Sequence, residues 1–226
     1  MSEPRTGARE VRVPVGKLML PGLLTVPEGA LGLVAFAHGG GSGRHSSRNR
    51  PVAGVLHEAG LATLLFDLLS DAEHRTDERT RHLRFDIHLL AERLTMAVDW
   101  LRAQDATREM HVGLFGASTG AAAALITAAR RPGTIDAVVS RGGRTDLAGN
   151  AITQVRAPTL LIVGDRDEPI IEANRQSAEQ LRVEHRVHVV PGASHLFEEP
   201  GALDDVARVA QVWFRQHLVA VHDRAR

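Results

Sequence analysis

A serine flanked by glycines is the strongest chemical signal in this sequence. The segment Gly116-Ala117-Ser118-Thr119-Gly120 follows a short apolar run and precedes an alanine-rich stretch that is typical of a helix. This strand–turn–helix context suits the G-x-S-x-G nucleophile elbow, in which a strained turn lifts the serine hydroxyl clear of the sheet. We therefore predict that Ser118 is a nucleophile. The alternative is a glycine-rich turn in which Ser118 only caps the helix.

A histidine and two aspartates follow other apolar runs and complete the chemistry that a nucleophilic serine needs. A serine hydroxyl reacts at neutral pH when a neutral imidazole takes its proton and a carboxylate orients that imidazole. His195 is the best candidate for the base, because its loop follows the last expected strand and lets it reach inward. Asp165 and Asp167 are the candidates for the carboxylate. The alternative interpretation makes both aspartates turn residues and His195 a solvated loop residue.

A glycine-rich loop offers donors for an oxyanion. Acyl transfer needs two backbone N–H groups at the developing negative charge, and one is expected on the residue after the nucleophile, Thr119. The other is expected from His38-Gly39-Gly40-Gly41, with Gly40 as the donor and Gly39 as the alternative. A phosphate-cradling loop is disfavoured, because neither the P-loop lysine nor a G-x-G-x-x-G pattern with a following acidic residue is present.

Several arginines follow the ends of expected strands. They are Arg44, Arg48, Arg50, Arg141 and Arg144. If they face the pocket, they can hold a carboxylate or a phosphate on the substrate. Arg44, Arg141 and Arg144, together with Gly39, are therefore candidate substrate-binding residues. The alternative is that these arginines lie on the surface and pair with the abundant acidic residues.

Three potential metal ligands, His82, Asp86 and His88, lie close together at the start of an expected amphipathic helix. A complete set of three strong ligands in a metal-binding arrangement is not apparent, so we interpret them as polar residues of the helix surface. We predict no metal and no cofactor. Asp67, directly after a buried run, is expected in a turn or in the pocket wall.

Alternating strand and helix patterns position these candidates. Strands are predicted at 10–15, 17–26, 31–37, 61–66, 110–115, 135–140, 159–163 and 185–190. Helices are predicted at 48–59, 83–103, 119–131, 171–181 and 202–218, and the charged stretch 68–81 is predicted to be a surface loop. The alternation predicts an α/β fold: a mostly parallel twisted sheet of about eight strands, helices on both faces, and little or no lid. Functional groups should gather at the carboxyl ends of its strands.

Composition limits the class of protein. The 226 residues suit a single domain, 1–226, and the 27 basic and 27 acidic residues give no sign of a nucleic-acid or acidic-membrane partner. The absence of cysteine excludes disulfides, thiolate metal sites and a cysteine nucleophile. No apolar run reaches the roughly 18 residues of a membrane span, and residues 1–7 lack a signal core. We expect a cytoplasmic monomer or homodimer.

From residue 18 to 217 the chain resembles an α/β-hydrolase of the dienelactone hydrolase type. The resemblance rests on segments 36–43 (FAHGGGSG), 116–120 (GASTG), 164–167 (GDRD) and 192–195 (GASH), with 44–50 and 82–87 similar to a bacterial subgroup known broadly as hydrolases. The chain order of nucleophile, acid and histidine is that of these enzymes. A G-x-x-D turn presents the acid in this superfamily, which implies Asp167 as the catalytic acid and leaves Asp165 to cap the turn or pair with Arg166.

The resemblance implies ester hydrolysis without a cofactor. Dienelactone hydrolases proper use a cysteine nucleophile, and this sequence has Ser118 in that place, so general carboxylesterase activity is favoured. The leading prediction is a serine hydrolase with a Ser118, His195 and Asp167 triad that acts on small-molecule esters or lactones with short acyl chains. The alternatives are acyl transfer or perhydrolysis with the same triad, and a non-catalytic binding protein on a hydrolase scaffold.

Overall fold

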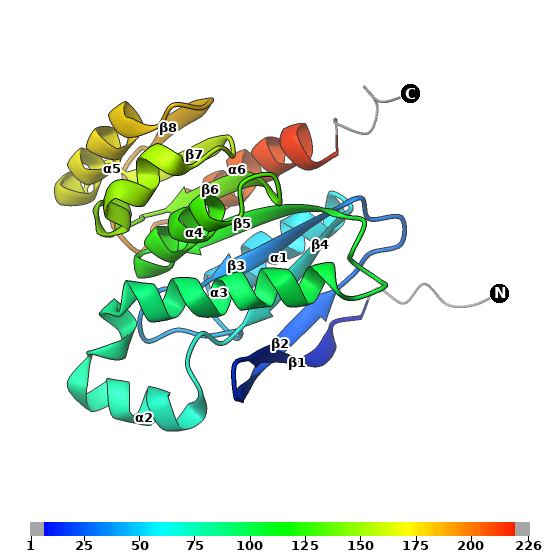
Figure 1. Ribbon diagram of the computed structural model, residues 1–226. Helices are drawn as coiled ribbons and strands as arrows, with labels where there is room; N and C mark the ends of the chain where they lie inside the picture. Colours follow the sequence, from blue (N-terminus) through cyan, green and yellow to red (C-terminus); the bar gives the residue numbers. More distant parts are fainter. Residues whose placement is uncertain (1–6, 220–226) are drawn as a thin grey trace.

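An eight-stranded sheet organises the molecule (Figure 1). The computed structural model describes residues 7–219. The prediction that residues 1–7 lack a signal core therefore falls almost entirely outside the described residues, as do residues 220–226. The strands are β1 (Arg9–Val15), β2 (Leu18–Thr25), β3 (Gly32–Ala37), β4 (Leu61–Phe66), β5 (His111–Ala117), β6 (Ile135–Arg141), β7 (Thr159–Gly164) and β8 (His185–Val190).

The spatial order of the strands is β1-β2-β4-β3-β5-β6-β7-β8. The β1–β2 and β2–β4 pairs are antiparallel, and every other neighbouring pair is parallel. In β3, β4 and β7 every residue is buried, as expected for strands that are covered on both faces. The predicted α/β architecture, with a mostly parallel sheet of eight strands, is confirmed.

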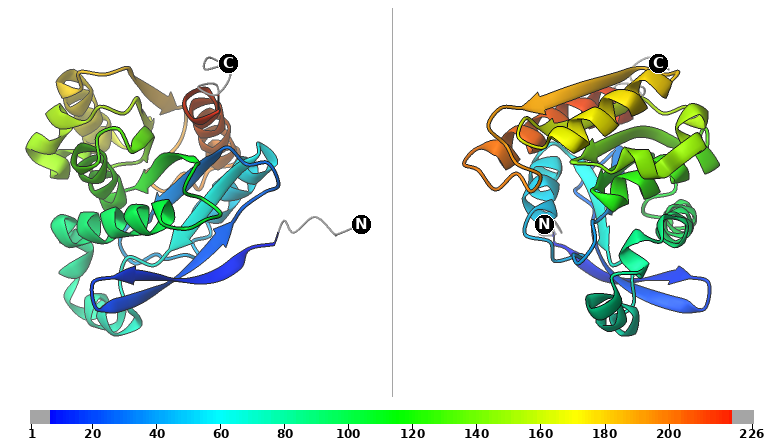
Figure 2. Two further views of the ribbon diagram at one scale, coloured as in Figure 1. Left: turned by 45° about the vertical axis from the view of Figure 1, so that its right-hand side comes forward. Right: turned by 90° about the vertical axis from the view of Figure 1, so that its left-hand side faces the viewer.

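Helices cover both faces of the sheet (Figures 1 and 2). On one face lie α1 (Asn49–Glu58) and α6 (Ala202–Leu218), and on the other lie α3 (Ile87–Arg102), α4 (Thr119–Arg130) and α5 (Glu168–Gln180). Each layer has its own apolar core: Phe36 and Phe115 pack toward α1 and α6, whereas Leu94 and Leu125 belong to the cluster on the opposite face. The carboxyl ends of the parallel strands therefore lie at one edge of the sheet, between these two helical layers.

The charged stretch 68–81 was predicted to be a surface loop, and that prediction is wrong. It contains α2 (Asp71–Thr80), which begins with a capping box between Ser70 and Glu73. The Glu73 carboxylate also accepts hydrogen bonds from both terminal nitrogens of Arg93 on α3, at 2.6 and 2.8 Å. Because polar contacts hold this helix in place, its sequence has no apolar stripe from which a helix could be predicted.

Other element boundaries differ from the predictions by a few residues. The long helix α3 begins at Ile87 because the Asp86 carboxylate caps it by accepting from the Leu89 N–H at 3.0 Å, and a 3₁₀ turn, η1 (Leu83–Phe85), precedes it. A 3₁₀ segment that was not predicted, η2 (Thr145–Gln154), follows β6. No helix within residues 7–219 combines the length and apolar character needed to span a bilayer.

The Glu73–Arg93 ion pair that anchors α2 should make the free energy of unfolding depend on pH in the acid range. Hydrogen bonding to Arg93 lowers the pKa of Glu73 from 4.5 to about 2, so its stabilising contribution is complete above pH 4.5 and is lost as the pH falls toward 2. Because the carboxylate is partly exposed, we expect Glu73→Gln to lower the free energy of unfolding by about 1–2 kcal/mol at pH 7 and by almost nothing near pH 2. Urea unfolding of both proteins across this range measures the difference.

The exposed Glu78 on the same helix supplies the control for that experiment. Glu78→Gln should change the free energy of unfolding by less than about 0.5 kcal/mol at any pH, because exposed surface charges contribute little. A Glu73→Gln difference that stayed constant from pH 7 to pH 2 would show that the Arg93 pair does not anchor α2.

Candidate active site

Ser118 stands on a strained turn between β5 and α4. Its backbone has φ 51° and ψ −121°, a conformation that a residue with a side chain adopts only under constraint. The constraint is visible in the backbone, where the Ser118 N–H donates to the Arg141 carbonyl at 3.2 Å. The side chain makes no capping hydrogen bond to α4. The geometry therefore resembles a nucleophile elbow more than a helix cap.

The two glycines around Ser118 are required by close packing. A Cβ at Gly116 would collide with the backbone of Ala121, and one at Gly120 would collide with the carbonyl of Ala37. The β3 and β5 strands and the first turn of α4 can approach one another only because both positions lack a side chain. The G-x-S-x-G pattern thus has a local structural reason in this fold.

His195 and Asp167 meet from two different loops. The His195 Nδ1 lies 2.6 Å from a carboxylate oxygen of Asp167, which follows β7 at the start of α5. Since a carboxylate only accepts, Nδ1 carries the proton, and in a neutral imidazole Nε2 is then the acceptor. The Asp167 side chain is 14% exposed, whereas Asp165 is an exposed residue. Of the two aspartates considered from the sequence, the structure brings Asp167 to the imidazole.

Ser118 and His195 line one cavity of about 150 Å³ at the carboxyl edge of the sheet. Gly39 and Gly40 line its wall as well. Within the described residues no hydrogen bond joins the Ser118 hydroxyl to the imidazole, an arrangement that often tightens only when substrate binds. The three predicted groups therefore share one site, with the aspartate–histidine contact already formed.

Backbone donors for an oxyanion are present in the same wall. A Cβ on Gly39 would lie 3.1 Å from the Ser118 Cβ, so this glycine allows the loop to approach the serine. In the described part of the chain, the N–H groups of Gly40 and Thr119 donate no hydrogen bond. Both remain available to a ligand oxygen, and the choice between Gly39 and Gly40 stays a prediction.

The glycine-rich loop is braced from two sides. His38 is buried, and its Nε2 accepts from the Leu68 N–H at 2.9 Å while Nδ1 lies 2.9 Å from the Gly39 carbonyl. Burial lowers the pKa of His38, so its imidazole is neutral and both nitrogens are occupied. On the other side, the stem of Arg84 packs against Gly40. His38 is therefore a structural support of the loop and not a base.

Arg84 links this loop to α2. Its guanidinium pairs with the fully buried carboxylate of Asp77 at 2.6 Å. Hydrogen bonds from Arg84 outweigh the effect of burial and lower the pKa of Asp77. The segment that sequence reasoning assigned to a loop thus positions a wall of the site. Nothing in the sequence pattern around residue 84 indicates this contact.

The candidate arginines occupy three different settings. Arg44 forms an ion pair with Asp67, which also accepts from the Arg44 backbone N–H. Arg144 is partly exposed and pairs with Asp146 at 2.7 Å, and its side chain is not part of the cavity wall. Arg141 is buried and does line the cavity, as does Arg48. Only part of the predicted arginine set therefore faces Ser118.

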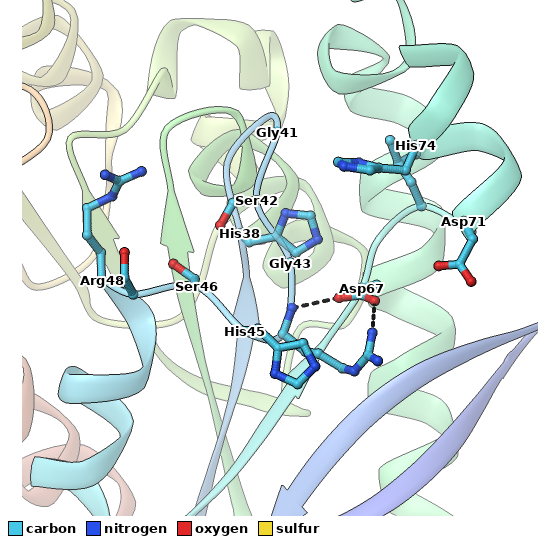
Figure 3. A pocket seen from close by; sticks show the side chains of 13 residues that line it. His38, Gly41, Ser42, Gly43, His45, Ser46, Arg48, Asp67, Asp71 and His74 are labelled. Carbon is cyan, nitrogen blue, oxygen red and sulfur yellow. Dashed lines mark hydrogen bonds and ion pairs between the residues drawn. The ribbon is translucent and has the colours of Figure 1, made fainter. Parts of the chain in front are cut away.

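A wider polar basin of about 420 Å³ adjoins the cavity and shares Ser42, Ser46 and Arg48 with it. Figure 3 shows this basin with Arg48 on one side and His74 and Asp71 on the other. The Asp67 carboxylate lies in its wall, as the sequence suggested. The basin gives the small cavity an open approach on one side.

Potential metal ligands do not gather within residues 7–219 in any group of three histidine, aspartate or glutamate side chains. The Asp86 carboxylate is used to cap α3, and His82 and His88 are exposed. Two further cavity neighbours escaped sequence reasoning. Asn49 lines the wall at the start of α1, and Phe197, at φ 56°, packs beside Arg141.

Comparison with known proteins gives a consistent result. The model of the dienelactone hydrolase family matches residues 22–219. A dienelactone hydrolase from Anabaena variabilis has 56% sequence identity and a TM-score of 0.93, over 96% of this chain and 100% of that one. Est1E from Butyrivibrio proteoclasticus has a TM-score of 0.76 at 16% identity, over 93% of this chain and 98% of that one, which is evidence of a shared fold alone.

The chain is also similar to part of a longer protein. A curated protein of Mycobacterium tuberculosis is 52% identical over 217 residues, which are 96% of this chain and 48% of that protein. It carries the provisional name phosphoribosyl transferase. The present chain thus spans about half the length of the curated relatives that it matches, and that name belongs to the longer protein.

Proposed function

Because this chain belongs to the dienelactone hydrolase family, we propose that it is a hydrolase that cleaves short carboxylic esters or lactones through an acyl-enzyme on Ser118. The family and the fold support hydrolase chemistry in general. The finer proposal depends on one observation: the Asp167–His195 hydrogen bond of 2.6 Å lies at the wall of the cavity that Ser118 also lines.

In the proposed acylation step, the Ser118 hydroxyl attacks the ester carbonyl carbon while His195 Nε2 takes its proton. Asp167 keeps the other imidazole proton on Nδ1 and stabilises the imidazolium that forms. The tetrahedral intermediate collapses when the carbon–oxygen bond to the leaving group breaks, and the imidazolium returns the proton to the departing alkoxide. Water then attacks the acyl-enzyme with the same base and releases the acid.

The oxyanion of each intermediate is proposed to accept from the N–H groups of Thr119 and Gly40, with Gly39 as the alternative to Gly40. Such donors act without reorganisation because the structure around them is already fixed. For Gly40 that support comes from the Arg84 side chain, and for Thr119 from the first turn of α4. The basin beside the cavity gives the leaving alcohol a route out.

Covalent labelling tests this proposal directly. A fluorophosphonate should add once per chain to the native protein, and tryptic mass spectrometry should place the adduct on Ser118. The Ser118→Ala protein should take up none. Folding of both proteins is compared by circular dichroism. If the native, folded protein failed to react, the result would favour a binding protein on a hydrolase scaffold.

A further inference from the structure

The loop that carries Gly40 has little structure of its own. Residues 39–41 are three consecutive glycines, the residue type with the greatest backbone freedom. The loop is closed by a hydrogen bond from the Ser42 N–H to the Gly39 carbonyl at 3.3 Å, and Gly40 itself is exposed. A donor stabilises an oxyanion well only if its position is fixed before the charge develops. The Gly40 N–H therefore needs support from outside the loop.

The side chain of Arg84 lies directly against this loop. A Cβ at residue 40 would be 3.0, 3.1 and 2.8 Å from the Cβ, Cγ and Cδ atoms of Arg84, and a Cβ at Gly41 would be 3.3 Å from its Nη1. The space that remains behind the loop, lined also by Leu90 of α3, measures about 10 Å³. That is about the smallest volume that holds one water molecule. While Arg84 stays in place, the loop has almost no room to move back.

Arg84 is itself fixed by Asp77 on α2. Its Nε and its backbone N–H donate to the two carboxylate oxygens at 2.6 and 3.1 Å, and its Nη2 donates to the Asp77 carbonyl at 3.1 Å. The Asp77 side chain is fully buried. A buried ion pair is often no more stabilising than apolar side chains of similar volume. The advantage that this pair offers is a fixed geometry for the arginine stem.

The beginning of the same segment holds the loop at a second point. The Leu68 N–H donates to His38 Nε2 at 2.9 Å, and the Leu68 carbonyl accepts from Arg93 Nη1 at 2.6 Å. The Arg93 guanidinium also pairs with Glu73 on α2. Segment 68–84 thus contacts the glycine loop at His38, where the loop begins, and again at Gly40.

We propose that Arg84, held by Asp77, is a positioning residue that fixes the Gly40 N–H for the oxyanion. This inference rests on the proposed function. Arg84 is not part of the wall of the cavity that Ser118 lines, so it acts through the loop and not on the substrate. Its loss should weaken the binding of the tetrahedral intermediate more than the binding of the substrate.

The kinetic test compares Arg84→Ala with the native protein on 4-nitrophenyl acetate and on trifluoroacetone. Ser118 adds to the carbonyl carbon of this ketone and gives a tetrahedral oxyanion, while His195 keeps the serine proton. Arg84→Ala should lower kcat/KM about 10- to 100-fold and raise the inhibition constant of the ketone by the same factor. Fluorophosphonate labelling, taken to completion, should still count one site per chain, whereas partial unfolding would lower that number.

Three further variants separate positioning from folding. Arg84→Lys keeps a stem and a cation for Asp77, so kcat/KM should stay within about threefold of native. Arg131→Ala removes another arginine–aspartate pair, with Asp99 at 2.6 and 2.8 Å, and should leave both constants within about twofold. The double variant Asp77→Ala/Arg84→Ala also removes the carboxylate that Arg84→Ala leaves buried and unpaired. Its melting temperature should exceed that of Arg84→Ala, while its kcat/KM should stay equally low.

Each outcome has a definite meaning. Recovery of the native rate in the double variant, or a loss of rate in Arg84→Ala without a matching loss of ketone affinity, would overturn the positioning role. Ester hydrolysis that Arg84→Ala leaves unchanged would overturn it as well, with the hydrolase proposal intact. A native protein that neither hydrolyses the ester, binds the ketone nor takes up fluorophosphonate would overturn both proposals.

Discussion

Replacement of Ser118 by alanine is expected to reduce kcat/KM for 4-nitrophenyl acetate by at least about 10⁴-fold. The substitution removes the oxygen that forms the acyl-enzyme, while His195, Asp167 and the backbone donors stay in place. The reaction that remains in the variant is direct attack of water on the ester. Substrate binding and the oxyanion donors accelerate this reaction only weakly. Initial rates at saturating and subsaturating substrate measure the loss.

Two features of the Ser118→Ala experiment make it decisive. The exposed Ser47 lies on the loop that lines the neighbouring basin, and Ser47→Ala should stay within about threefold of the native rate. The alanine also relieves no packing conflict, so the melting temperature should change little. A Ser118→Ala rate within tenfold of native would instead place the chemistry on a water molecule activated by His195.

Much of this architecture could be predicted because its signals are local. Apolar runs of six or seven residues separated by helical periodicities indicate buried parallel strands, and each candidate then falls at a strand end. The elbow can form only if residues 116 and 120 lack side chains, so the two glycines of the motif are themselves a signal of the fold. The choice of Asp167 over Asp165 as the catalytic acid was harder, because both aspartates lie in one turn and differ only in where their side chains point.

The remainder depends on contacts between distant segments. Helix α2 is stabilised by the Glu73–Arg93 and Asp77–Arg84 pairs, whose partners are 20 and seven residues away in sequence. A single sequence does not show which of its many charges will meet. Its polar composition is equally typical of an exposed loop, so the prediction failed there for a physical reason.

The arginines illustrate the same limit at the site. Arg141 and Arg144 flank a pair of glycines symmetrically in the sequence, yet one is buried in the cavity and the other pairs with Asp146. The difference arises because Arg141 still belongs to β6, where its Cα pairs with that of Ala117 next to the nucleophile and the residue lines the cavity. Three residues later the chain has turned away. Side-chain direction after a strand end is set by that turn and not by residue type.

Replacement of Asp167 by asparagine is expected to lower kcat by about 10³- to 10⁴-fold, and Asp165→Asn by less than about threefold. An amide at residue 167 can donate to Nδ1, which favours the tautomer with the proton on Nε2, and that nitrogen then cannot accept from Ser118. The loss should therefore appear in kcat with 4-nitrophenyl acetate while the fold persists. Asp165 is exposed, and the carboxylate that hydrogen-bonds to the imidazole is that of Asp167, so Asp165 is the matched control. A larger loss in Asp165→Asn than in Asp167→Asn would exchange the roles of the two carboxylates, and no loss in either would remove the acid from the mechanism.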